Sequence, residues 1–92
     1  ICRDCFEVDA DLGEKFQSEF GYPGISRPGR PGKAYVDLEL AAAVQFVEAG
    51  IRPESITLMN ACTYENRQHF FSHRRDKGIT GSMAAYIKLI QP

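Results

Sequence analysis

The sequence predicts an α+β protein made of two helices with a small mixed sheet. Residues 9–20 and 37–49 carry apolar residues at helical spacing. Residues 55–60 and 82–90 are short runs of residues that favour strands. Between the two helices, residues 21–34 are rich in glycine and proline, which favours a loop.

The first expected helix covers residues 9–20. Asp11 and Glu14 have the D-x-x-E spacing of a capping box, and Gly21 is a suitable stop. Gly13 weakens the prediction by about 1 kcal/mol relative to alanine. Four apolar residues lie on one face of this helix: Val8, Leu12, Phe16 and Phe20.

The loop 21–34 repeats a Pro-Gly turn three times and is basic at Arg27, Arg30 and Lys33. We interpret it as a solvated surface loop. The alternative is a mobile lid over an anionic ligand.

The second helix, residues 37–49, has the stronger signals. Asp37 is a good N-cap, and Gly50 follows the last turn. Ile51 is expected to fold back on Phe46 in a Schellman motif.

Strands are expected at residues 55–60 and 82–90, with a third, short one in the "HFFS" stretch at 69–72. In the last expected strand, alternate residues share one face: Ala85, Ile87 and Leu89.

Composition excludes several classes of protein. The 92 residues have a formal net charge of -1, which argues against binding nucleic acid through bulk positive charge. No apolar run is long enough to span a membrane. Three cysteines do not form an even disulfide framework, so the cytoplasm is the expected location. Because the chain opens on Ile1 instead of methionine, we expect a piece of a longer polypeptide.

Two sets of residues raise the question of a metal or redox site. Cys2 and Cys5 form a C-x-x-C pair, but no second pair accompanies them, so we interpret them as structural thiols. A redox pair and a metal site are the alternatives. Cys62, His69 and His73 have the composition of an open zinc site, although a polar face of a turn explains them equally.

The "HRRD" stretch is the best local candidate for binding an anion. Arg74 and Arg75 each offer a planar fork of donors that matches phosphate or carboxylate. Asp76 is placed to hold one guanidinium. Gly78 and Gly81 allow backbone N–H groups to approach the same ligand. A surface turn with compensated charges is the alternative.

The closing motif resembles the C-terminal part of the laccase-domain family. These proteins are also called multicopper polyphenol oxidoreductase-like, or YfiH-like, purine nucleoside phosphorylases. The resemblance extends over essentially the whole chain, from "CFEV" through "YVDL" to the end. Its matched positions are densest in one group: Cys62, Thr63, Phe70, Phe71, Ser72, Arg74, Arg75, Asp76, Thr80, Gly81, Met83 and Ala84.

The resemblance implies that residues 1–92 are the C-terminal segment of a larger YfiH-like α/β domain. It implies a cytoplasmic enzyme that cleaves adenosine and inosine with phosphate and binds one zinc ion. Adenosine deamination and action on methylthioadenosine are further implied activities, and copper-dependent laccase is the older label. An oligomer is possible.

The reaction that the resemblance implies needs a site for phosphate and the nucleoside, and we assign residues to it from their chemistry. Phosphate binding is assigned to the arginine pair, and a ribose hydrogen bond to Ser72 or Tyr64. Phe71 is placed to line the purine, although a core phenylalanine is the alternative. The residues expected to contact phosphate or substrate are thus Arg74, Arg75, Ser72, Tyr64 and Phe71, with Asp76 orienting a guanidinium.

Two departures from the family limit what carries over. The family's metal ligands are two histidines and a cysteine in "HG", "DC" and "HAGWRG" motifs, and neither histidine motif occurs here. We therefore expect no metal ligand in this segment, and no bound metal or turnover by the segment alone. His73 and Ser82 stand where the family shows tyrosine and arginine. A catalytically silent structural or oligomerisation segment, or an independent anion- or nucleotide-binding module, is the alternative.

Overall fold

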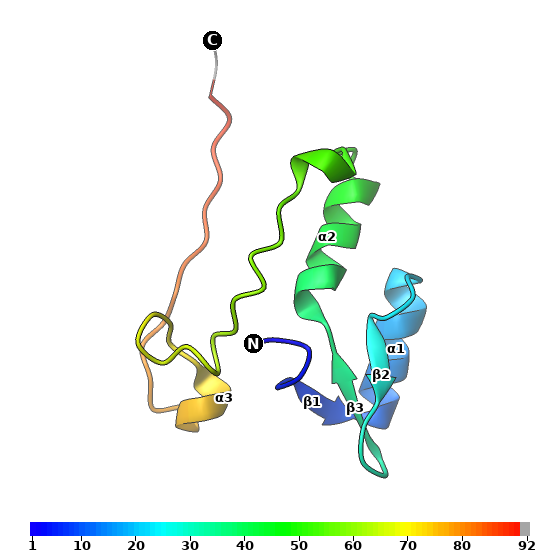
Figure 1. Ribbon diagram of the computed structural model, residues 1–92, viewed down its shortest axis with the longest axis vertical. Helices are drawn as coiled ribbons and strands as arrows, with labels where there is room; N and C mark the ends of the chain where they lie inside the picture. Colours follow the sequence, from blue (N-terminus) through cyan, green and yellow to red (C-terminus); the bar gives the residue numbers. More distant parts are fainter. Residues whose placement is uncertain (91–92) are drawn as a thin grey trace.

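The computed structural model describes residues 1–90, so the predicted segment 1–92 extends two residues beyond the described part. Its helices and strands confirm the α+β class (Figure 1). In chain order they are β1 (Glu7–Asp9), α1 (Ala10–Phe20), β2 (Ser26–Pro28), β3 (Lys33–Val36), α2 (Leu38–Glu48), a 3₁₀ turn (Pro53–Ser55) and α3 (His73–Asp76). The sheet and α1 lie at one side, and the chain after α2 runs apart from them.

The sheet has three strands in the order β1-β3-β2, and both pairings are antiparallel where a mixed sheet was expected. β2 and the start of β3 lie inside the stretch 21–34, so the prediction of a loop throughout it was wrong. Its Pro-Gly repeats form the turn of a hairpin, in which the Gly29 N–H donates to the Lys33 carbonyl at 3.0 Å. Pro28 is tolerated because β2 is an edge strand.

Helix α1 packs against this sheet through Gly13, its one buried residue. A Cβ atom at Gly13 would lie 2.6 Å from Ala34 Cβ and 2.9 Å from Ser26 Oγ. The glycine that weakened the helix prediction is therefore what allows the helix to approach the strands closely. Around this contact the core consists of Val8, Ala34 and Val36, with Phe6 and Phe16 packed against them.

The predicted capping box at the start of α1 is absent from the structure. The N-cap is Asp9, which makes no side-chain cap and instead forms an ion pair with Lys33 Nζ at 2.7 Å. Asp11 consequently lies in the first turn. The predicted stop is confirmed: Gly21 is left-handed, with φ of 63°, and its N–H donates to the Gln17 carbonyl at 2.9 Å.

Both predicted ends of α2 are confirmed. Asp37 Oδ1 accepts a hydrogen bond from the Leu40 N–H at 3.0 Å. At the other end, the Ile51 N–H donates to the Phe46 carbonyl at 3.0 Å, and Gly50 has φ of 106°. This pattern is a Schellman stop.

The strands predicted at 55–60, 69–72 and 82–90 were wrong for the described chain. A strand requires a neighbour that completes its ladder of backbone hydrogen bonds, and residues 1–90 provide none at these places. Residues 56–60 and 82–90 are extended in Figure 1, but they lie unpaired. No helix within residues 1–90 combines the length and apolar character needed to cross a membrane.

Gly13 provides a test of the packing. In an open helix Gly→Ala is stabilising by about 1 kcal/mol, but here the added methyl group overlaps Ala34. We expect Gly13→Ala to lower the free energy of unfolding of the intact protein by about 1–3 kcal/mol in a denaturant titration. Ser18→Ala, at an exposed site of the same helix, is the control and should not destabilise. A stabilised Gly13→Ala variant would contradict the close approach.

Candidate functional site

The "HRRD" stretch, the best local candidate for binding an anion, forms the single-turn helix α3. Ser72, which is buried, caps it: its hydroxyl oxygen accepts a hydrogen bond from the Arg75 N–H at 3.3 Å. Lys77 and Gly78 end it with φ of 54° and 86°. The two arginines therefore leave a helical turn in different directions, which gives them different surroundings.

The side chain of Arg75 is mostly shielded from solvent, with only 14% of it exposed. Its Nε and Nη2 donate to the two carboxylate oxygens of Asp76 at 3.1 and 3.0 Å. Nη2 also donates to the Phe70 carbonyl at 3.0 Å. Nη1 donates to the carbonyls of Thr63 and Tyr64 at 2.8 and 3.4 Å. All three guanidinium nitrogens are thus engaged in holding residues 63–64 against residues 70–76.

The ion pair changes the titration of Asp76. Hydrogen bonds from Arg75 hold the pKa of the Asp76 carboxyl below its ordinary value of 3.8. Because the folded pKa is lowered, the pair stabilises the fold above the unfolded pKa, and this contribution is lost as the pH falls through the folded pKa.

Arg74 is exposed and differently held. Its Nη1 donates to the backbone carbonyl of Glu7 at 2.9 Å, and its guanidinium lies 5.2 Å from the centre of the Phe6 ring. Since an arginine has five N–H donors, this single hydrogen bond leaves most of the fork for another acceptor.

The other predicted site residues lie around this turn. Phe71 and Tyr64 are 49% and 39% exposed. A Cβ at Gly81 would lie 2.6 Å from the Phe71 ring, so the loop after α3 passes directly against this ring. The contacts predicted between substrate and Arg74, Arg75, Ser72, Tyr64 and Phe71 stay predictions.

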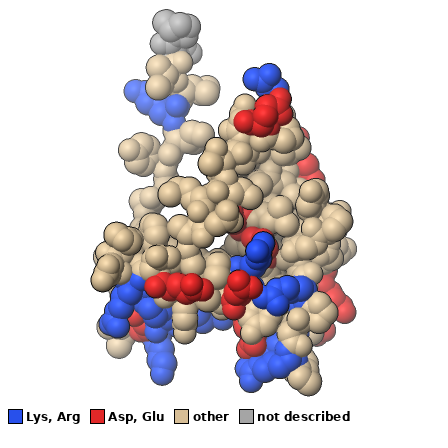
Figure 2. All heavy atoms as spheres, in the orientation of Figure 1, with Lys and Arg blue, Asp and Glu red and all other residues tan. Residues whose placement is uncertain are grey.

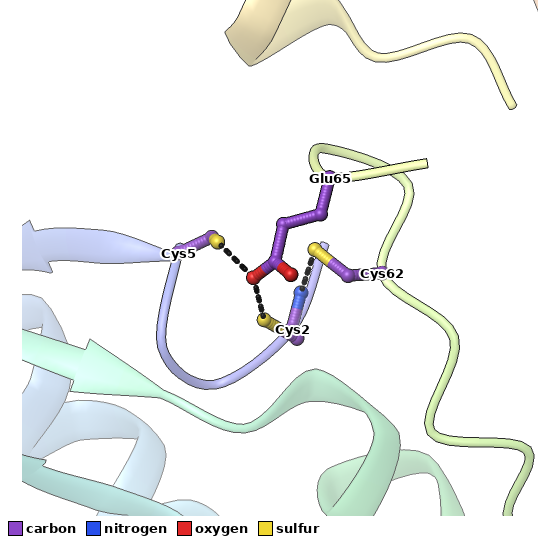
Figure 3. Close-up of side chains that lie close together, drawn as sticks. All are labelled: Cys2, Cys5, Cys62 and Glu65. Carbon is purple, nitrogen blue, oxygen red and sulfur yellow. Dashed lines mark hydrogen bonds between the residues drawn. The ribbon is translucent and has the colours of Figure 1, made fainter. Parts of the chain in front are cut away.

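A second group of side chains comes together where the N-terminal segment meets residues 62–65 (Figure 3). The sulfur atoms of Cys2, Cys5 and Cys62 and a carboxylate oxygen of Glu65 all lie within 4.8 Å of one another. The thiols of Cys2 and Cys5 donate to Glu65 Oε1 at 3.5 and 3.1 Å. The Cys2 N–H donates to Cys62 Sγ at 3.2 Å. We call these four residues the thiol cluster.

The thiols differ in their acidity. Burial and then the Glu65 carboxylate raise the pKa of Cys5, and burial raises that of Cys2. Burial also raises the pKa of Cys62, but backbone amides, first that of Cys2 and then that of Glu65, outweigh it and lower the pKa to about 7. Cys62 is therefore the thiol with the most thiolate character near neutral pH.

Sequence spacing missed the thiol cluster. We expected a zinc site to need a second cysteine pair or a histidine at suitable spacing. Because the family's histidine motifs are absent, we also predicted no metal ligand in the segment. The fold instead supplies Cys62 and Glu65 from about sixty residues away. His69 and His73 are not part of any candidate ligand group in the described residues. The structure thus gives the segment side chains that could bind a metal.

A polar cavity of about 280 Å³ adjoins the thiol cluster. Figure 2 shows that acidic side chains gather in the lower middle of this face, with basic ones to either side. Four carboxylates and one arginine, Arg3, line this cavity, and the excess of acidic groups favours a cation over an anion. Its acidic lining residues are Asp4, Asp37, Glu39 and Glu65.

Comparison with known proteins gives one family match. The family model described as "Multi-copper polyphenol oxidoreductase laccase" matches residues 1–90. No solved structure matches the chain significantly.

Several curated relatives are similar over most of the chain. Purine nucleoside phosphorylase YlmD of Geobacillus stearothermophilus is 41% identical over 90% of this chain and 31% of its own length. A purine nucleoside phosphorylase of Xylella fastidiosa (strain Temecula1) is 46% identical over 78% of this chain and 28% of its own. Adenosine deaminase RL5, from an unknown prokaryotic organism, is 36% identical over 82% and 29%. The chain spans about a third of the length of these relatives.

The Arg75 contacts predict a structural role that can be measured. Arg75→Ala leaves a carboxylate and three carbonyls without their donor, so we expect the melting temperature of the intact protein to fall by several degrees. Arg67→Ala, at an exposed arginine of the same region, is the control and should melt close to the parent.

The pH dependence provides a second check. The difference in stability between the parent and Arg75→Ala should shrink as the pH falls below about 4, because Asp76 becomes protonated. An Arg75→Ala variant that melts like Arg67→Ala at neutral pH would show that these contacts do not stabilise the fold.

Proposed function

The chain belongs to the multi-copper polyphenol oxidoreductase laccase family, and we propose that the protein it forms part of is a purine nucleoside phosphorylase. The observation that carries the proposal is that relatives bearing this name are 41% and 46% identical to the chain across most of its length. The reaction would join phosphate to C1′ of the ribose of inosine or adenosine while the bond from C1′ to the purine nitrogen breaks.

In this reaction we assign the contact with the phosphate anion to Arg74. Its guanidinium is exposed, is fixed by one hydrogen bond to Glu7 and by the Phe6 ring, and keeps other donors available. Positive charge at this position favours an anionic nucleophile and stabilises negative charge in the transition state.

Arg75 and Asp76 then act as positioning residues. The ion pair between them fixes α3, on which Arg74 is carried, and the Ser72 hydroxyl caps the same turn. Tyr64 and Phe71 are exposed enough to line a nucleoside, with Tyr64 or Ser72 assigned to a ribose hydroxyl. Arg75 would contact phosphate only by giving up one of its internal acceptors.

We do not assign the zinc implied by the family to the two histidines of this chain. His69 and His73 do not approach Cys62 as a ligand group within the described residues. No step of the proposed reaction is routed through a metal held by them. The family's two histidines and cysteine would come from the part of the protein outside this chain.

We further propose that this remaining part is the main partner of the chain. Extended segments 56–60 and 82–90 expose large apolar side chains, which packing against that part would cover. The exposed residues are Leu58, Met59, Tyr86, Ile87, Leu89 and Ile90. Three free thiols suit the cytoplasm, which we propose as its location.

The proposal is tested by incubating the intact protein with inosine and phosphate and measuring hypoxanthine by chromatography. We expect phosphate-dependent release of hypoxanthine by the intact protein, and none by the 92-residue chain alone. Because one relative is named an adenosine deaminase, adenosine without phosphate is the second assay. Inosine formed there would add deamination. No turnover of either nucleoside would favour a catalytically silent segment.

Substitution of Arg74 tests the proposed contact with phosphate. We expect Arg74→Ala to lower kcat/KM for inosine roughly 30- to 1000-fold, because a charge-assisted contact in the transition state is lost. Its melting temperature should change less than that of Arg75→Ala, since it makes one hydrogen bond within the chain. Parental turnover by Arg74→Ala would remove Arg74 from the site.

A further inference from the structure

The thiol cluster unites ligand types that zinc prefers. Three sulfur atoms and one carboxylate oxygen from Cys2, Cys5, Cys62 and Glu65 lie within 4.8 Å of one another. In a tetrahedral site with Zn–S bonds near 2.3 Å, neighbouring sulfur ligands lie roughly 3.8 Å apart. The separations between the sulfur atoms therefore exceed those of a tetrahedral zinc site by at most about 1 Å.

From this geometry we propose that Cys2, Cys5 and Cys62 bind one zinc ion as thiolates, with Glu65 as the fourth ligand (Figure 3). Thiolate ligands select zinc over hard cations such as magnesium or calcium. On binding, the three thiols release three protons to solvent, and the Glu65 oxygen that accepted hydrogen bonds from Cys2 and Cys5 faces the metal instead.

The backbone supports this arrangement before any metal binds. Within the C-x-x-C turn, the Cys5 N–H and the Phe6 N–H both donate to the Cys2 carbonyl at 3.0 Å, which brings Cys2 and Cys5 to one side of the turn. The Cys2 N–H points at Cys62 Sγ, a contact that stabilises a thiolate. Glu65 completes the group from the turn that follows Cys62.

Burial and charge favour a cation at the same place. Cys62 is 4% exposed, so its sulfur is shielded from solvent, whereas Glu65 is exposed and leaves a path for an ion to enter. The neighbouring cavity carries three further carboxylates, those of Asp4, Asp37 and Glu39. A zinc ion here would join the first five residues to residues 62–65 and stabilise the fold directly.

Thiol protection in the intact protein tests the site without relying on activity. The reduced, zinc-loaded and desalted protein is treated with iodoacetamide with and without a chelator, and modified cysteines are mapped by peptide mass spectrometry. We expect Cys2, Cys5 and Cys62 to be protected together and to become reactive together after chelation. Equal labelling of all three with and without chelator would overturn the proposal.

Zinc content provides the second measurement. We expect Cys5→Ser to hold one zinc ion per chain fewer than the parent, whatever zinc other parts of the protein bind. Glu65→Gln, at an exposed ligand, should keep the fold and weaken zinc on the order of 10- to 100-fold in chelator competition. Glu14→Gln, at an exposed carboxylate of α1 that does not line the cavity, is the matched control and should retain the parental content.

Two results would count against the site in these measurements. Unchanged zinc in both Cys5→Ser and Glu65→Gln would exclude these ligands. A disulfide between any two of the three cysteines in protein isolated under reducing conditions, with no metal-dependent protection, would make the cluster a redox pair instead. If Cys5→Ser does not fold, thiol protection in the parent and the Glu65→Gln affinity decide between these outcomes.

Discussion

The guanidinium of Arg75 joins the parts of the molecule that lie outside the sheet. It holds Asp76 within α3 and the carbonyls of Thr63, Tyr64 and Phe70, so two stretches of irregular chain share one centre. Most hydrogen bonds in a protein belong to helices and strands, but residues 57–72 have neither. The half-buried guanidinium of Arg75 gives three of their backbone carbonyls a partner.

The contacts of Arg75 also position the residues that meet the N-terminal segment. Arg75 fixes the backbone of residues 63–64, and the neighbouring Cys62 and Glu65 are the residues that meet Cys2 and Cys5. On the other side of α3, Arg74 contacts Glu7 just as β1 begins. The two adjacent arginines therefore have different surroundings, as expected for consecutive residues of a helical turn. Arg75 makes contacts within the chain, and Arg74 faces solvent.

Local signals predicted three helix ends correctly, although the capping box expected at Asp11 is absent. The N-cap at Asp37, the stop at Gly21 and the return of Ile51 onto Phe46 each depend on a few neighbouring residues, and all three are confirmed. The hairpin within 21–34 was missed because its proline and glycine residues favour a loop, although β2 and β3 pair locally and β1 adds to the other edge of β3. The thiol cluster was missed for a different reason, because sequence spacing cannot show that residues sixty positions apart meet.

The wrong strands point to a different physical limit. Residues 82–90 have the alternation of a strand, yet a strand is stable only when a neighbour accepts and donates its backbone hydrogen bonds. Within residues 1–90 that neighbour is missing, and the side chains of Ile87 and Leu89 remain about nine-tenths exposed. Because the chain spans about a third of its relatives' length, the pattern in the sequence and the absence of a strand do not conflict. The alternation gives residues 82–90 one apolar face, and we propose that this face packs against the part of the protein outside this chain.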